Sequence, residues 1–284
     1  MGFCSRGQSG WQRGRLCRDH VYCTESLNVI DPRAVIDPAA EIDEGVSIGP
    51  FTIVGAGVKI AKGTTVGPHA VIRGPCSIGR DNRIFQFASV GEDPQDKKYA
   101  GEQTYLEIGD RNTIREFTTV HRGTVQDQSC TCIGSDNLLM AYTHVAHDCR
   151  IGDHAILANA ASLGGHVHVG DWAILGGFSI VHQFCRIGQH CFTGMGSVIS
   201  KDVPPYVMAA GHPARPHGIN SEGLQRRGFT AEQIATIKRA YKTLYTSELP
   251  LAAAREQITA LAAGNDALRV LADFLAVSER SIVR

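Results

Sequence analysis

The sequence predicts a mainly β protein, a parallel β-helix of hexapeptide repeats followed by a smaller α-helical domain. Three observations support this prediction: an aliphatic residue recurs at every sixth position, 31 glycines accompany only 7% aromatic residues, and the repeat stops after two consecutive prolines. A period of six matches neither an amphipathic helix nor a strand, but it matches a triangular coil whose three sides are hexapeptides. One full coil therefore takes 18 residues.

The repeat begins with eleven consecutive Ile or Val residues spaced by six, from Ile30 to Val90. If half of all residues were apolar, a run of this length would arise by chance at roughly one starting position in two thousand. The phase returns at Ile108, shifts by one residue, and runs from Ile133 to Ile187. The side chain four positions after the aliphatic residue is small, which predicts that both positions point into a narrow core. Four cysteines hold such positions and are interpreted as core residues rather than redox or metal-binding groups: Cys76, Cys149, Cys185 and Cys191.

Two interruptions of the repeat predict loops. Residues 91–107 and 121–132 lack the six-residue rhythm, so we expect them to project from a β-helix that spans residues 28–205. Residues 1–27 carry arginines and few apolar side chains. We expect a disordered leader there, with an organelle transit peptide as the alternative.

The pattern becomes helical after the Pro204-Pro205 pair. Thr230 and Gln233 have the spacing of a capping box and precede an amphipathic run, which predicts the start of a helix. Two further amphipathic stretches follow. We therefore expect a helical C-terminal domain over residues 206–284.

Composition and charge exclude two classes of function. The 28 Lys and Arg residues balance 28 Asp and Glu residues, so the chain has no basic footprint for a nucleic acid. No run approaches the roughly 18 apolar residues that a membrane helix requires, so we expect no stable membrane insertion. The nine cysteines, an odd number without a C-x-x-C pair, indicate a reducing, cytoplasmic location.

Seven of the twelve histidines lie between residues 144 and 190, at positions where the repeat faces outward. The 18-residue coil stacks His147 under Gly165 and places Asp148 in the next column, under His166. Adjacent coils lie about 4.8 Å apart, so these groups share one face, with His182 on its other flank. An imidazole can remove a hydroxyl proton near neutral pH, a carboxylate can orient it, and a free glycine N–H can stabilise an oxyanion. Together they predict acyl transfer.

Other interpretations fit the same histidines. They can cover a solvated face or a subunit contact, or three imidazoles can hold a zinc ion with an open water position. For the protein as a whole, the alternatives are an acyltransferase that acts on an amine, a zinc-dependent carbonic anhydrase and a non-catalytic scaffold. Loss of activity on chelation would favour the carbonic anhydrase, whereas His147→Ala would leave the activity of a scaffold unchanged.

Seven short segments complete the pattern: residues 86–92 (QFASVGE), 121–125 (HRGTV), 134–140 (GSDNLLM), 146–149 (AHDC), 165–167 (GHV), 181–184 (VHQF) and 222–229 (EGLQRRGF). Together with the hexapeptides they resemble the bacterial UDP-N-acetylglucosamine O-acyltransferase family, which opens lipid A biosynthesis. The resemblance extends from about Asn28 to Arg284, and the combination of segments is far more specific than the hexapeptides alone.

This resemblance implies a left-handed parallel β-helix with an α-helical C-terminal domain, assembled as a homotrimer with active sites in clefts between subunits. It also implies transfer of an (R)-3-hydroxyacyl group from acyl carrier protein to the 3-hydroxyl of UDP-N-acetylglucosamine by direct general-base catalysis. We expect no cofactor and no metal, because the acyl group arrives on the phosphopantetheine of the carrier protein.

The resemblance also assigns roles to residues. It makes His147 the general base, Asp148 its partner and Gly165 the oxyanion donor. Substrate binding is expected from a larger set: Gln95, Asp96, Lys98, His144, His166, His182, Gln183, Asn220, Glu222, Arg226 and Arg227. The two guanidinium groups of this set suit a pyrophosphate.

The resemblance places the acyl-chain groove at Gly177 and Met195, which share a column of the coil with Asn159. Some members of the family have glycine where this chain has Met195. A bulky side chain there should shorten the accepted chain, so we expect a medium-length hydroxyacyl donor. A basic surface for an acidic carrier protein is expected from three further residues: Lys238, Arg239 and Lys242.

Overall fold

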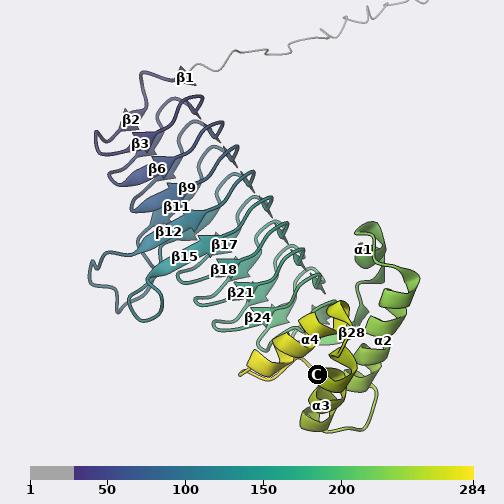
Figure 1. Ribbon diagram of the computed structural model, residues 1–284. Helices are drawn as coiled ribbons and strands as arrows, with labels where there is room; N and C mark the ends of the chain where they lie inside the picture. Colours follow the sequence, from purple (N-terminus) through teal and green to yellow (C-terminus); the bar gives the residue numbers. More distant parts are fainter. Residues whose placement is uncertain (1–28) are drawn as a thin grey trace, which may run out of the picture.

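The computed structural model describes residues 29–284 (Figure 1). Within this range the chain forms a left-handed parallel β-helix of triangular cross-section, followed by four helices at its C-terminal end, which confirms the predicted fold class. The expected leader, residues 1–27, lies outside the described residues.

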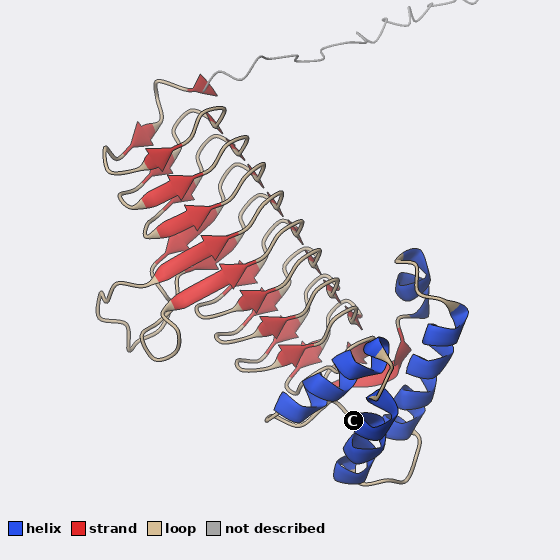
Figure 2. Ribbon diagram, viewed as in Figure 1, coloured by secondary structure: helices blue, strands red, loops and turns tan. Residues whose placement is uncertain are grey.

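The β-helix has three sheets, one on each side of the triangle (Figure 2). Sheet A contains β1 (Val29–Ile30), β4 (Ser47–Ile48), β7 (Thr65–Val66), β10 (Arg83–Ile84), β13 (Thr113–Ile114), β16 (Leu138–Leu139), β19 (Ile156–Leu157), β22 (Ile174–Leu175), β25 (Phe192–Thr193), β27 (Val207–Gly211) and β28 (Ala214–Ile219). Sheet B contains β2 (Val35–Ile36), β5 (Ile53–Val54), β8 (Val71–Ile72), β11 (Ser89–Glu92), β14 (Thr119–His121), β17 (His144–Val145), β20 (Ser162–Leu163), β23 (Ile180–Val181) and β26 (Val198–Ile199). Sheet C contains β3 (Glu41–Ile42), β6 (Val58–Ile60), β9 (Cys76–Ile78), β12 (Tyr105–Ile108), β15 (Cys130–Ile133), β18 (Arg150–Ile151), β21 (His168–Val169) and β24 (Arg186–Ile187).

Neighbouring strands of each sheet pair residues that lie 18 apart in the sequence, as the predicted coil requires; Leu139, for example, pairs with Leu157. Two coils are longer. Ile84 pairs with Ile114, thirty residues further on, and Ile114 pairs with Leu139, twenty-five residues further on. The first long coil exceeds 18 residues by 12, which is a multiple of six. The second exceeds 18 residues by 7, which is one more than six. This difference explains why the repeat returns in phase at Ile108 and is then shifted by one.

The interior of the β-helix contains both sets of residues that the repeat predicts to point inward. Aliphatic residues such as Ile72 and Leu157 are less than 2% exposed. The small positions are equally buried, and the four cysteines predicted to be core residues are buried free thiols: Cys76, Cys149, Cys185 and Cys191. Sulfur here fills space in a narrow core.

The two projecting loops are shorter than predicted. Strand β11 extends to Glu92 and β12 begins at Tyr105, so the first loop comprises residues 93–104. The second loop comprises residues 122–129, because β15 begins at Cys130 and pairs with β12 over four residues. Backbone pairing between neighbouring coils continues past the end of the side-chain rhythm, which is why the sequence pattern alone overestimates the loops.

The three corners of the triangle each carry a column of side chains with φ between 55° and 72°. The aromatic corner, between sheets A and B, is the part of its column formed by Phe51, His69, Phe87, Phe117 and Tyr142; Ala160 and Phe178 continue the column. The histidine corner, between sheets B and C, consists of Asp148, His166 and Phe184. The column between sheets C and A begins with Asp81, Arg111 and Asp136, and its continuation, the tryptophan corner, consists of His154, Trp172, His190 and Tyr206.

The C-terminal region begins with a hairpin, although helix was predicted from residue 206. Strand β27 pairs with β25 in parallel and with β28 in antiparallel orientation, because this pairing continues sheet A beyond the last full coil. The helices follow: α1 (Ser221–Arg226), α2 (Ala231–Tyr245), α3 (Leu251–Ala262) and α4 (Asp266–Val277). The predicted capping box of Thr230 and Gln233 begins α2. Within residues 29–284, no helix combines the length and the hydropathy that crossing a bilayer requires.

Candidate active site

Both projecting loops interrupt the same corner of the β-helix. Each connects a strand of sheet B with a strand of sheet C, so both lie against the histidine corner, beside β12 and β15 (Figure 1). The loops and the corner line a cavity of about 670 Å³. Six predicted site residues lie in its wall: Gln95, Asp96, Lys98, His147, His166 and Gln183. Three further residues line it: Gln126, Asp127 and Phe184.

A buried guanidinium group joins the two loops. Arg122 donates hydrogen bonds to the carbonyl oxygen of Gly91, at 2.5 Å, and to the phenol oxygen of Tyr99, at 3.2 Å. It also forms an ion pair with the carboxylate of Asp93. Since Asp93 and Tyr99 belong to the first loop and Arg122 to the second, these bonds hold the walls of the cavity together.

His147 lies at the floor of the cavity with its two ring nitrogens in different environments. Its Nδ1 lies 2.8 Å from Oδ2 of Asp148, and its side chain is 13% exposed. Within residues 29–284, its Nε2 has no hydrogen-bond partner. A carboxylate at Nδ1 favours the tautomer that carries its proton there, which leaves the Nε2 lone pair free to accept a proton from a ligand.

Asp148 is fixed by the second loop. Its carboxylate accepts hydrogen bonds from the backbone N–H of Thr124, at 2.9 Å, and from the Thr124 hydroxyl, at 2.6 Å. Its own N–H donates to the hydroxyl of Thr131, at 2.8 Å. Burial by itself raises the pKa of Asp148, but the hydrogen bonds from His147 and Thr124 outweigh burial and hold that pKa below its usual value. The carboxylate is therefore charged at neutral pH and orients the His147 ring.

The predicted stacking of His147 and Gly165 is present. A Cβ atom added at Gly165 would lie 2.6 Å from Cε1 and 2.7 Å from Nε2 of His147, so only glycine permits this approach. The neighbouring His166 N–H donates to the His147 carbonyl oxygen at 3.0 Å, which ties the two coils together. Within the described part of the chain, the Gly165 N–H donates to no acceptor. A free N–H beside a free imidazole nitrogen is the arrangement that an oxyanion intermediate requires.

The other predicted histidines have distinct environments. His166 contacts the His147 ring edge-on, with 5.0 Å between the ring centroids, and its Nδ1 lies 2.9 Å from Oδ2 of Asp127. The Nδ1 atom of His144 lies 2.8 Å from the Thr119 hydroxyl oxygen. Burial, with smaller effects of nearby histidines, lowers the pKa of His144 to about 4. It is therefore neutral near pH 7.

His182 does not line the cavity. Its Nδ1 lies 3.1 Å from the carbonyl oxygen of Gln183 and 3.3 Å from a guanidinium nitrogen of Arg280. We expected His182 on the same face as His147 and His166; its side chain contacts Arg280 of the C-terminal segment and does not join them in the cavity wall. The donor atoms at this corner that lie close enough to share a metal ion are those of His147, Asp148 and His166, so three imidazoles are not gathered within residues 29–284.

The remaining predicted site residues lie away from this cavity. Gly177 and Met195 lie between sheets A and B, and Met195 is 84% exposed. The substrate-binding residues of the C-terminal segment lie in or beside α1: Asn220, Glu222, Arg226 and Arg227. Arg227 packs at the tryptophan corner, with its guanidinium carbon 5.2 Å from the centre of the Trp172 ring.

The structure also gives local roles to two residues of that segment. Asn220 caps α1 by accepting a hydrogen bond from the Gly223 N–H, and its amide donates to the His190 carbonyl oxygen at 3.0 Å. Glu222 and Arg226 form an exposed ion pair with each other. A single chain therefore does not bring these groups to His147.

Three residues of the second loop were missed by the sequence analysis. Thr124 holds Asp148, Asp127 holds His166, and Arg122 holds the first loop. The segment 121–125 is one of those that carry the family resemblance, yet the resemblance assigned no role to its residues. Periodicity carries no information inside a loop, so only the folded chain shows which groups these side chains contact.

Comparisons with known proteins agree with the predicted family. The family model described as UDP N-acetylglucosamine O-acyltransferase, domain 2, matches residues 202–283, and the model for the bacterial transferase hexapeptide (six repeats) matches residues 133–165. A Herminiimonas arsenicoxydans protein described as acyl-[acyl-carrier-protein]--UDP-N-acetylglucosamine O-acyltransferase is 55% identical over 262 residues, which cover 91% of this chain and 100% of that protein. A Thiobacillus denitrificans protein of the same description is 56% identical over 258 residues, with the same coverage.

Solved structures of the same kind match 90% of this chain. LpxA from Acinetobacter baumannii is 50% identical, with a TM-score of 0.88 and coverage of 90% of this chain and 100% of the other. UDP-N-acetylglucosamine acyltransferase from Francisella novicida is 42% identical, with a TM-score of 0.89 and coverage of 90% and 94%. The likeness includes both the β-helix and the C-terminal helices.

Proposed function

The chain belongs to the acyl-[acyl-carrier-protein]--UDP-N-acetylglucosamine O-acyltransferase family, and from this premise we propose how its residues catalyse the reaction. The enzyme transfers a 3-hydroxyacyl group from acyl carrier protein to UDP-N-acetylglucosamine, the first step of lipid A biosynthesis. We propose that the group has the (R) configuration and that the sugar 3-hydroxyl is the acceptor.

His147 acts as the general base in this proposal. Its Nε2 takes the proton of the sugar hydroxyl as the hydroxyl oxygen attacks the thioester carbonyl of the donor. The Gly165 N–H donates a hydrogen bond to the carbonyl oxygen, which becomes negatively charged in the tetrahedral intermediate. When the C–S bond breaks, the thiol of the carrier leaves with the proton held by His147. No bond to the enzyme forms at any stage.

Asp148 orients this base. The hydrogen bonds from Thr124 hold the carboxylate at His147 Nδ1, so the ring presents an unprotonated Nε2 to the substrate. The carboxylate also stabilises the imidazolium that forms when His147 takes the proton. The supporting observation for the whole mechanism is this pair of neighbours: an imidazole whose Nε2 and a glycine whose N–H have no hydrogen-bond partner within residues 29–284.

The polar walls of the cavity bind the sugar in this proposal. Gln95, Asp96 and Lys98 from the first loop line the cavity together with His166 and Gln183 of the coil. Several donors and acceptors around one hexose fix its orientation relative to His147, and fixed orientation is itself a large part of catalysis. No cofactor is needed, because the donor group arrives on the phosphopantetheine of the carrier protein.

We propose a homotrimer whose active sites lie between subunits. His147 lies at the histidine corner, whereas Arg227 packs at the tryptophan corner of the same chain. For both to contact one sugar nucleotide, a second copy must supply one of them. Coexpression of His147→Ala and Arg227→Ala chains should then restore activity in mixed oligomers, and equally inactive mixtures would contradict shared sites.

We also propose a cytoplasmic enzyme whose α2 helix contacts the carrier protein. The six cysteines within residues 29–284 are free, which suits a reducing compartment. Lys238, Arg239 and Lys242 are exposed on α2 and offer a basic surface to an acidic partner.

The acyl chain is proposed to run from the cavity toward Met195. Gly177 precedes Gln183 by six residues in the same coil, so the acyl chain crosses sheet B over a distance of up to about 20 Å. The exposed Met195 side chain closes the far end. Turnover with donors of graded length should show a preference for medium chains, and Met195→Gly should shift the optimum to longer ones. An optimum at long chains that Met195→Gly leaves unchanged would remove this proposal.

The decisive experiment is an assay of the purified protein with UDP-N-acetylglucosamine and hydroxyacyl carrier proteins, with and without a chelator. We expect an O-acylated sugar nucleotide and a free carrier thiol at equal rates, insensitive to the chelator. Trapping of an acyl-enzyme, or loss of turnover on chelation, would contradict direct general-base catalysis.

A further inference from the structure

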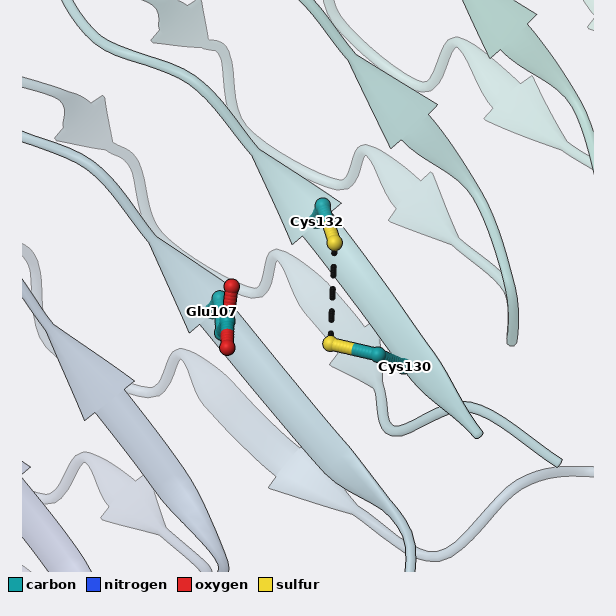
Figure 3. A group of neighbouring side chains, drawn as sticks. All are labelled: Glu107, Cys130 and Cys132. Carbon is teal, nitrogen blue, oxygen red and sulfur yellow. Dashed lines mark hydrogen bonds between the residues drawn. The ribbon is translucent and has the colours of Figure 1, made fainter. Parts of the chain in front are cut away.

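Three potential metal ligands lie together on the outer face of sheet C. Cys130 and Cys132 alternate on β15 with Thr131 and Ile133, and the latter two are buried, so both thiols face outward. Glu107 on β12 is the register partner of Cys132. Figure 3 shows the three side chains close together on the two adjacent strands.

The distances between these groups suit one small cation. The two sulfur atoms are 3.5 Å apart, and the ligand atoms of all three residues lie within 4.8 Å of one another. In a tetrahedral zinc site, Zn–S bonds of about 2.3 Å place two sulfurs roughly 3.8 Å apart. A change of a few tenths of an ångström in side-chain position would therefore create two thiolate ligands, and the carboxylate can supply a third.

Solvent exposure distinguishes Cys130 and Cys132 from the other described cysteines. Cys130 and Cys132 are partly exposed, whereas Cys76, Cys149 and Cys191 are buried in the core. Burial raises the pKa of each of these core thiols to about 12. The core interpretation of cysteine therefore does not apply to the outward pair.

We propose that Cys130, Cys132 and Glu107 form a binding site for one zinc-class divalent cation, with solvent at the fourth position. Thiolate ligands select soft or borderline metals over Mg²⁺ or Ca²⁺. On binding, each thiol releases its proton to solvent as its metal–sulfur bond forms. Two thiolates and a carboxylate then carry three negative charges against two positive ones. Arg150, the register partner of Cys132 on the other side, balances the remaining charge.

The site lies at the base of both loops that line the active-site cavity. Cys130 directly follows the loop 122–129, and Glu107 lies three residues beyond the loop 93–104. An ion held by both strands would cross-link β12 to β15. It would restrain the loops that carry Asp96 and Asp127, without contacting substrate. The proposal does not depend on the mechanism above, because its test measures metal binding.

The test uses the full chain, kept reduced with a non-thiol reductant and titrated with Co²⁺ as a spectroscopic probe and then with Zn²⁺. We expect one Co²⁺ per chain, an intense thiolate-to-cobalt charge-transfer band, and displacement of Co²⁺ by Zn²⁺. The double variant Cys130→Ser with Cys132→Ser should lose the band, and Glu107→Gln should weaken zinc affinity roughly tenfold or more. Zinc should also slow proteolysis within both loops of the wild-type chain.

Three control variants test whether the charge-transfer band arises from Cys130 and Cys132. Ser77→Ala removes a neighbouring outward oxygen of the same sheet and should keep the band. His166→Ala removes a ligand of the other possible metal group. The triple variant Cys4→Ser, Cys17→Ser and Cys23→Ser removes the cysteines outside the described residues. Both should keep the band. A band that persists in the double variant, or a reduced wild-type chain that binds no Co²⁺ or Zn²⁺, would overturn the proposal.

Discussion

The aromatic corner and the histidine corner have the same backbone and different chemistry. Both place side chains in the left-handed region of φ, which costs non-glycine residues roughly 1–2 kcal/mol each. At the aromatic corner the rings form a continuous stack, with Phe87 5.3 Å from His69 and 5.2 Å from Phe117. At the histidine corner only His166 and Phe184 stack, at 4.3 Å, while Asp148 is bound by Thr124.

The difference shows where a repeating fold can carry function. Between Phe51 and Tyr142 the aromatic corner repeats the same ring stacking from coil to coil and presents a uniform column of rings. Two insertions at the histidine corner supply polar groups and part of the wall of the cavity that His147 also lines. Substitutions at the histidine corner should therefore reduce catalysis, and substitutions in the aromatic stack between Phe51 and Tyr142 should reduce only stability.

The largest expected effect is that of His147→Ala. Removal of the general base should lower kcat by roughly 10²-fold to 10⁴-fold. Circular dichroism and oligomeric state should stay unchanged, because the side chain is not part of the core. Steady-state kinetics of the purified variant measure the effect. Loss of less than a factor of ten would show that this corner does not catalyse the reaction.

Asp148→Asn should lower kcat roughly 10²-fold or more, since an amide can donate to Nδ1 and stabilise the wrong tautomer of His147. The change should also alter stability as a function of pH. Because the folded-state pKa of Asp148 is lowered, its carboxylate adds stability above the unfolded pKa of about 3.9, and this contribution is lost as pH falls through the folded value.

Urea unfolding of wild type and Asp148→Asn at several pH values tests this second effect. The wild-type advantage in free energy of unfolding should be on the order of 1 kcal/mol at pH 7 and should shrink below pH 4. An advantage that grows toward low pH would mean that the carboxylate is not held in its charged form.

Gly165→Ala should have the next largest effect, a loss of roughly 10-fold to 10²-fold in kcat. The new Cβ would lie within 2.7 Å of the His147 ring and must displace it. Gly55→Ala is a matched control, because the nearest atom to its Cβ is 3.5 Å away and the position lies several coils from the cavity. Equal kinetics for the two variants would remove the proposed contact between imidazole and glycine.

A pair of phenylalanine variants tests the comparison most directly and has the smallest effects. Phe184→Ala should raise KM for the sugar nucleotide several-fold, since Phe184 lines the cavity and supports the His166 ring. Phe87→Ala should leave kcat/KM unchanged and lower the free energy of unfolding by about 1 kcal/mol, the value of a stacked aromatic pair. If Phe87→Ala impaired catalysis as much as Phe184→Ala, the two corners would not differ in function.

The fold was predictable in detail because its repeat is short. The spacing of Ile and Val residues gave the 18-residue coil, the inward cysteines and the stacking of His147 against Gly165. It overestimated both loops and missed the hairpin β27–β28, since backbone pairing continues where the side-chain rhythm has ended. Aromatic residues at left-handed corners were also not predictable from local preference, because only stacking on the coils above and below compensates their cost.

What the sequence by itself determined is the order along the β-helix axis: which residues lie above one another and which point inward. Hydrogen bonds between successive coils transmit this order from residue to residue, so counting by eighteen recovers it. What only the tertiary structure decided is the arrangement around the axis at the interruptions. There Thr124 reaches Asp148, Arg122 joins the loops, and Arg227 packs at another corner than His147. These contacts join residues through space without any repeated spacing, and no count along the chain contains them.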